Sequence, residues 1–192
     1  MMTRLSVVLL LAVSVVGMAQ PVSLDLRSKL DFHAESVYSP LSMAESGAYA
    51  GFLQATGSPR EWGQGGGAYG KRFASVVGTS AIHATLAFGL DSALHQDPRY
   101  YRSLGTGFWR RTAHALRGTI LTRTDSGGET LSAWRLGSDY GAAFLSNQWY
   151  PDRLNTLKQG AAQGSLRLAF DFAGNLGSEF WPDLKGKLRR IL

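Results

Sequence analysis

Apolar residues recur at helical spacing along most of the chain, which predicts an all-α fold. A glycine, a proline or a cluster of both marks most ends of these segments. Ser42-Met-Ala-Glu45 has the spacing of a capping box, in which each of the two side chains satisfies an orphan amide at a helix start. The pattern predicts helices over about 43–56, 68–95, 105–122, 131–149 and 153–181.

The last of these segments carries two competing patterns. Small residues at positions 161, 165, 169, 173 and 177 form a row at helical spacing, and we expect this row to face a neighbouring helix closely. Apolar residues at 166, 168, 170 and 172 instead alternate with other residues, as in a half-buried strand. Length and the lack of a turn signal favour a helix that ends at Pro182, followed by a short basic tail over 184–192.

The segment before the first predicted helix alternates briefly between apolar and polar residues over 22–27. This alternation predicts an extended N-terminal arm over 20–42, ahead of a single helical domain over 43–192. Together with the alternation over 166–172, it leaves an outer-membrane β-barrel as the alternative fold.

Glycine and alanine recur every four residues inside the predicted helices. Gly70, Ala74 and Gly78 form one such row, and Gly137 and Gly141 form another. Rows of small side chains let a neighbouring backbone approach closely, a device used most often by membrane helices and also by soluble bundles. They also make a homo-oligomer through small-residue helix faces possible.

The first 19 residues have the three parts of a cleavable secretory signal peptide. A short basic start with Arg4 precedes an apolar run over 5–16, and Gly17-Met-Ala19 supplies the small residues before the cleavage point. The run of about a dozen apolar residues is shorter than the roughly 20 needed to span a bilayer, which disfavours a retained anchor. We therefore expect an exported protein that begins near Gln20, located in the periplasm or cell envelope.

Composition narrows the chemistry that an exported chain of this kind could use. It contains no cysteine, which excludes disulfides, thiolate metal sites and cysteine nucleophiles. Without Arg4 the balance is 19 basic against 14 acidic residues. This excess favours anionic partners such as lipid headgroups, lipopolysaccharide, peptidoglycan acids or nucleic acid.

Two glycine-rich motifs resemble known catalytic or binding loops but lack the required context. Gly65 to Lys71 has the spacing of a phosphate-binding loop, yet Arg72 replaces the Ser or Thr and no apolar strand precedes it. Asp125-Ser-Gly-Gly128 resembles the nucleophile region of chymotrypsin-like proteases, without the upstream strands of their barrels. A helix-entry loop and a turn, respectively, are the better interpretations.

The four histidines do not form a ligand motif, so we expect no metal and no cofactor. His95, oriented by Asp97, is the best general-base candidate in the chain. The alternative is that His95 lies in the last turn of a helix, where a positive charge complements the dipole.

A cationic stretch from Arg99 to Arg123 contains six arginines and no acidic residue. Two tyrosines, a phenylalanine and a tryptophan lie among them, a composition that suits a bilayer interface. A solvated basic face over an ordinary core is the alternative. The same composition would suit single-stranded nucleic acid, but export leads us to expect no nucleic-acid partner. The residues expected to contact an anionic surface are Arg99, Arg102, Trp109, Arg110, Arg111 and Arg117.

Five motifs together resemble a family of small exported bacterial proteins of unknown function. They are Arg60-Glu-Trp-Gly-Gln-Gly65, Tyr69-Gly-Lys-Arg-Phe73, His95-Gln-Asp-Pro-Arg-Tyr-Tyr-Arg102, Thr122-Arg-Thr-Asp-Ser-Gly127 and Glu179-Phe-Trp-Pro-Asp183. The resemblance covers roughly residues 60–185 and implies an exported location without implying a mechanism.

The sequence as a whole predicts a non-enzymatic envelope protein that associates with an anionic membrane or envelope surface. Close-packed helices and the basic aromatic segment would mediate this association. The alternative function is a small periplasmic hydrolase that acts on an envelope component through His95 and Asp97.

Overall fold

The computed structural model describes residues 23–191 and confirms the predicted all-α fold. Three short 3-10 turns and one two-stranded hairpin accompany the helices in the described residues. The helices are α1 (Leu26–Tyr38), α2 (Pro40–Ala55), α3 (Gly66–Ala93), α4 (Phe108–Ile120), α5 (Ala133–Ser146) and α6 (Leu157–Ile191). The hairpin is β1 (Leu121–Arg123) with β2 (Glu129–Leu131), and the turns are η1 (Arg60–Trp62), η2 (Asn147–Trp149) and η3 (Asp152–Leu154). The predicted signal peptide lies outside the described residues.

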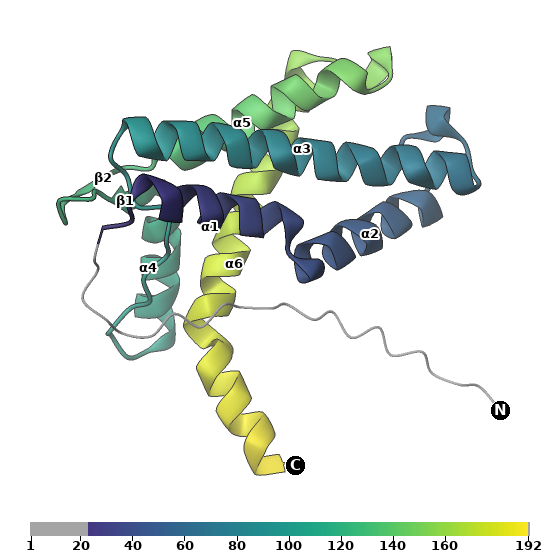
Figure 1. The fold of residues 1–192 in the computed structure, drawn as a ribbon. Coiled ribbons are helices and arrows are strands. Elements are labelled where there is room, and N and C mark those ends of the chain that lie inside the picture. Colours follow the sequence, from purple (N-terminus) through teal and green to yellow (C-terminus); the bar gives the residue numbers. More distant parts are fainter. Residues whose placement is uncertain (1–22, 192) are drawn as a thin grey trace.

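Helix α3 is the centre of the fold (Figure 1). Helix α5 packs along one side of it, and α1 and α2 pack on it one after the other. Helix α6 crosses this layer, contacts α5 with its first half and α4 further along, and then projects from the body of the molecule. The long α6 therefore joins two parts of the structure, one around α3 and α5 and one around α4.

Glycines set the closest contacts between helices. One of them belongs to a predicted row of small residues, Gly137, and another, Gly164, does not. A Cβ atom on Gly137 would lie 2.6 Å from Leu90, as expected for a close contact between α5 and α3. On α6, a Cβ on Gly164 would lie 2.5 Å from the Tyr140 ring of α5. Four members of the small row on α6 are exposed, so the prediction that this row packs closely within the chain is wrong. These four are Ala161, Ser165, Ala169 and Ala173.

The prediction of an extended arm is also wrong, because residues 26–38 form helix α1. Asp25 caps this helix by accepting a hydrogen bond from the Ser28 amide at 2.7 Å. Its buried face consists of Lys29, His33 and Val37. Two of these three side chains are ionisable, so an apolar periodicity could not reveal the helix.

Two helix boundaries also differ from the sequence prediction. Helix α2 begins three residues early, with Ser39 as its cap and Pro40 in its first turn, where the fixed φ of proline is favourable. Helix α6 continues through Pro182 instead of ending there. The segment 166–172, which supported the barrel alternative, lies inside α6, and that alternative is therefore wrong.

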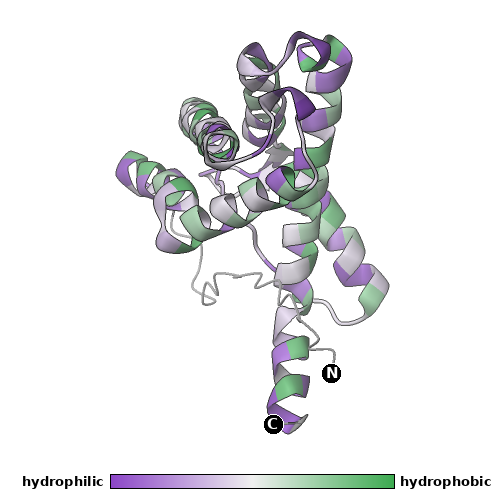
Figure 2. Cartoon of the chain, turned by 90° about the vertical axis from the view of Figure 1, so that its right-hand side faces the viewer, coloured by the Kyte–Doolittle hydropathy of each residue, from purple (hydrophilic) through white to green (hydrophobic). Residues whose placement is uncertain are grey.

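The interior of the described chain is small and polar. Seven of its nine buried hydrophobic residues are alanines, and Trp134 is the largest. Many large apolar side chains instead lie at the surface, and Figure 2 shows apolar and polar residues interspersed along the helices. This distribution leaves apolar surface available for contacts outside the chain.

Candidate membrane-contact surface

Helix α4 presents its large apolar side chains to the outside. Trp109 is 79% exposed, Leu116 is 53% exposed and Ile120 is 37% exposed. These residues belong to the stripe that the sequence pattern identified, and Ala113 of the same stripe is exposed as well. The stripe is therefore not part of the core of the described chain.

Small residues on the opposite face explain this orientation. Ala115 is fully buried and Thr119 is 1% exposed, and both face α6. The Asn175 side-chain amide of α6 donates a hydrogen bond to Thr119 Oγ1 at 3.0 Å. Because small side chains and this hydrogen bond let α4 approach α6 closely, the helix turns its large residues outward.

Three of the predicted arginines accompany the apolar stripe. Arg110 and Arg117 lie seven residues apart, and so on one side of α4, and both are exposed. Arg117 forms an ion pair with Glu129 of β2. Arg102 and Arg110 have no ion pair within the described part of the chain. We call the exposed residues Arg102, Leu104, Phe108, Trp109, Arg110, Leu116, Arg117 and Ile120 the α4 surface.

Two other predicted arginines point inward and stabilise the fold. Arg99 donates to the Asp97 carboxylate, with Nη2 2.6 Å from Oδ2, and its side chain is 19% exposed. Arg111 pairs with Glu179 and Asp183, and its guanidinium lies 4.3 Å from the centre of the Phe180 ring. The structure thus separates Arg99 and Arg111 from the arginines that face outward.

Glu179 of α6 connects this helix to α4 and to the loop between α3 and α4. Its fully buried carboxylate accepts hydrogen bonds from Tyr100 Oη and the Ser103 amide, both at 2.7 Å. It also lies 3.2 Å from His114 Nδ1 and 3.4 Å from Arg111 Nε. Burial alone would raise the pKa of Glu179, but the hydrogen bonds from Ser103, Tyr100 and Arg111 hold that pKa below its usual value.

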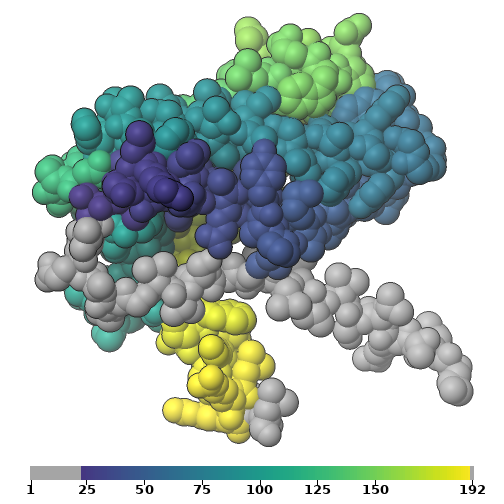
Figure 3. Space-filling model, in the orientation of Figure 1, coloured from purple at the N-terminus to yellow at the C-terminus, as the bar shows by residue number. Residues whose placement is uncertain are grey.

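The C-terminal end of α6 extends the basic surface. Leu184 and Leu188 are 51% and 45% exposed and lie four residues apart, on one face of the helix. Four basic residues and no acidic ones accompany them over 184–190. The yellow end of the chain projects from the molecule in Figure 3, and we call this segment, residues 184–190, the basic end of α6. Sequence reasoning noted its charge but missed the apolar pair, which the Leu-x-x-x-Leu spacing could have indicated.

The structure does not pair His95 with Asp97. The His95 side chain is 82% exposed, and its Nδ1 lies 3.9 Å from Oδ2 of Asp125. The Asp97 carboxylate instead accepts hydrogen bonds from Arg99 and, at 2.7 Å, from Tyr101 Oη. Burial would raise the pKa of Asp97, but these hydrogen bonds hold it below its usual value. Asp97 therefore does not orient His95 as a general base.

Helix α3 has the length and composition of a membrane span. Among the described residues it is the one helix with this length and composition. In the structure, 22% of its most apolar stretch of 18 residues is buried. It packs against α1, α2 and α5, and it carries the buried charged residues Arg72 and Asp91. No cluster of three or more potential metal ligands occurs within residues 23–191.

Comparison with known proteins gives no match: no family model, no curated protein and no solved structure resembles the chain. The resemblance carried by the five motifs therefore stays a prediction. Within the structure, residues of different motifs contact one another. Thr122 Oγ1 donates to the Asp97 carbonyl at 2.7 Å, and Tyr100 donates to Glu179. These two contacts give residues of the last three motifs a structural role.

Proposed function

We propose that this protein is an exported envelope protein that binds peripherally to an anionic membrane surface. The α4 surface and the basic end of α6 make the contact. The observation that carries the proposal is the outward apolar stripe of α4, with Trp109 79% exposed beside exposed arginines. The export of the protein rests on the predicted signal peptide.

Two forces of different range act at such a contact. Each arginine near an anionic membrane contributes about 1 kcal/mol, and salt screens this attraction beyond about 10 Å at 0.1 M. The exposed rings and aliphatic side chains enter the headgroup region, and salt does not screen their contribution. The number of exposed cations and apolar residues on the α4 surface supports a contact that uses both forces.

Liposome sedimentation tests the proposal. The purified protein is expected to bind vesicles that contain phosphatidylglycerol much more strongly than vesicles of phosphatidylcholine alone. Raising the salt concentration from 0.05 to 0.5 M, a range of roughly 14 to 4 Å in screening length, should weaken binding without abolishing it.

The apolar part of the contact is tested with Trp109→Ala. Loss of this ring should cost about 1.5 kcal/mol or more, which is about tenfold in affinity, and the loss should persist at high salt. Leu157→Ala is the matched control, because Leu157 is 82% exposed at the start of α6, outside the α4 surface.

The electrostatic part is tested with the double variant Arg102→Glu and Arg110→Glu. At low salt it should lose at least about 2 kcal/mol, or about thirtyfold in affinity. Arg27→Glu with Arg60→Glu makes the same change of charge at side chains that are 89% and 80% exposed elsewhere. Equal losses in the two double variants would reduce the contact to non-specific charge attraction.

Two other outcomes would contradict the proposal. Equal binding to anionic and neutral vesicles would refute recognition of an anionic surface. A protein that stays in bacterial membranes through a carbonate wash would be integral, and α3 would then be the segment to test.

A further inference from the structure

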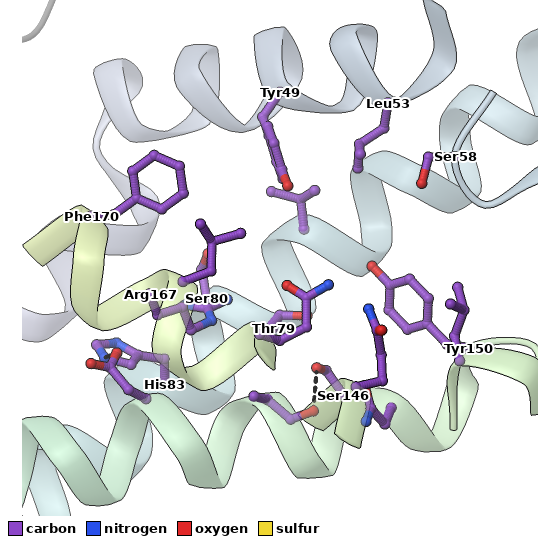
Figure 4. A pocket seen from close by; sticks show the side chains of 18 of the residues that line it. Tyr49, Leu53, Ser58, Thr79, Ser80, His83, Ser146, Tyr150, Arg167 and Phe170 are labelled. Carbon is purple, nitrogen blue, oxygen red and sulfur yellow. Dashed lines mark hydrogen bonds and ion pairs between the residues drawn. The ribbon is translucent and has the colours of Figure 1, made fainter. Parts of the chain in front are cut away.

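A second feature, separate from the α4 surface, is a cavity between α2, α3, α5 and α6. Its volume is about 570 Å³, which lies in the range of small-molecule sites. Figure 4 shows Tyr49 of α2, His83 of α3 and Arg167 of α6 around it. Asp139 of α5 and Asp171 of α6 complete its charged side.

A buried carboxylate of this cavity has an oxygen without a partner. Asp139 is 1% exposed, and its Oδ1 lies 3.2 Å from His83 Nε2. Its Oδ2 has no hydrogen-bond partner among residues 23–191. Ser138 Oγ lies 3.1 Å from the same His83 nitrogen, so the three residues do not have the arrangement of a catalytic triad, which uses both ring nitrogens.

Asp171, the second carboxylate of the cavity, forms an ion pair with Arg135. Asp171 Oδ2 lies 3.1 Å from Arg135 Nε, and Arg135 is 5% exposed. Burial, followed by the nearby Asp139 carboxylate, raises the pKa of Asp171 to about 6. Arg135 therefore supplies the cation that pairs with Asp171.

Arg167 is the remaining cation of the cavity. It is half-buried, and within the described chain it makes neither a hydrogen bond nor an ion pair. Burial lowers the pKa of its guanidinium, and Asp139 and Asp171 act on it only from beyond ion-pair distance. A partly desolvated guanidinium without a partner is costly, and its planar donors match a carboxylate or a phosphate.

The rim of the cavity is apolar and partly open. Phe170 is 63% exposed, Leu166 is 46% exposed and Tyr49 is 45% exposed, and all three line the cavity. Figure 4 shows Tyr49, Phe170 and Arg167 around the same cavity. An anion held by Arg167 would therefore place an attached apolar group against these side chains.

We propose that this cavity binds a small anionic amphiphile, with a carboxylate or phosphate at Arg167 and an apolar body between Tyr49, Leu166 and Phe170. A hydroxyl on the head of the ligand would donate to Oδ2 of Asp139. This site uses none of the residues of the α4 surface, so it stands or falls independently of membrane binding.

Fluorescence titration with 8-anilinonaphthalene-1-sulfonate, an anionic aromatic probe, tests the site. The uncharged N-phenyl-1-naphthylamine serves as its matched counterpart. Arg167→Gln is expected to weaken binding of the anionic probe by about tenfold to a hundredfold, whereas binding of the neutral probe should hardly change. Arg167→Lys should restore part of the affinity, and Phe170→Ala should weaken binding of both probes.

Two controls separate the site from general effects. Lys158→Gln removes one exposed positive charge from the same helix outside the cavity, and it should leave both probes unaffected. Trp109→Ala should also leave the Arg167-dependent binding intact. Circular dichroism and thermal unfolding show whether Arg167→Gln is folded.

Competition with the unaltered protein gives a test that needs no variant. Dodecanoate or dodecyl phosphate should displace the anionic probe, and the more effective of the two identifies the head group. Dodecanol should displace it at least tenfold less well. The proposal is overturned if neither anion displaces the probe, if dodecanol does so equally well, or if a folded Arg167→Gln variant binds the anionic probe like the wild type.

Discussion

The contact between α5 and α6 depends on the absence of a side chain at Gly164. A Cβ atom there would lie 2.5 Å from Cδ1 and 2.8 Å from Cγ of the Tyr140 ring. Ordinary contacts begin near 3.4 Å, so in Gly164→Ala the ring must move by about 1 Å. The ring is also tethered, because Tyr140 Oη lies 2.9 Å from Ser165 Oγ. Such overpacking typically costs about 1–3 kcal/mol.

Gly174→Ala provides a control within the same helix. A Cβ atom on Gly174 would have no other atom within 4 Å, and the residue is exposed. Replacement of a helical glycine by alanine at an open position should stabilise the protein by about 0.5–1 kcal/mol. The gain in helix propensity is common to both variants, so the difference between them isolates the cost of the clash.

Thermal unfolding and denaturant titration measure this difference. We expect Gly174→Ala to be more stable than Gly164→Ala by about 1–3 kcal/mol, with about 2–4 °C in Tm for each kcal/mol. Equal stabilities would show that α5 and α6 do not approach each other as described, and the cavity between them would then lose its structural basis.

Other predictions concern the row on α6, the Glu179 cluster and processing. Ala169→Leu should change the free energy of unfolding by less than about 0.5 kcal/mol, because Ala169 is exposed. Glu179→Ala should cost about 3 kcal/mol in urea titrations, since Arg111 and His114 lose their shared carboxylate. The pKa of Glu179 is lowered in the folded state, so its contribution is complete above the ordinary value of 4.5 and is lost as the pH falls below it. Glu179→Gln should therefore flatten the stability profile below that pH, and an unchanged profile would contradict this role. Intact-mass analysis of protein from a bacterial envelope should show a chain that begins near Gln20, and retention of Met1 would refute export.

Local periodicity was sufficient to predict most helices of the fold. Helices α3, α4 and α5 largely coincide with the predicted ranges because apolar residues at helical spacing, with glycine and proline at the ends, act over neighbouring turns. Helix α1 was missed because its buried face is built from Lys29 and His33. Those side chains become acceptable in the interior only through distant partners, namely the Gln96 carbonyl and the Asp91 carboxylate.

The sequence alone identified the basic aromatic segment and its apolar stripe, because charge and helical spacing are local properties. Only the tertiary structure decided which side of α4 faces outward, which exposed Trp109 and turned Arg111 toward Glu179. The cavity around Arg167 could not be predicted either, since its lining comes from four helices and the turns between them, spread over residues 45–171. Burial and pairing depend on what a side chain meets across the fold, and that information is not contained in the spacing of its neighbours.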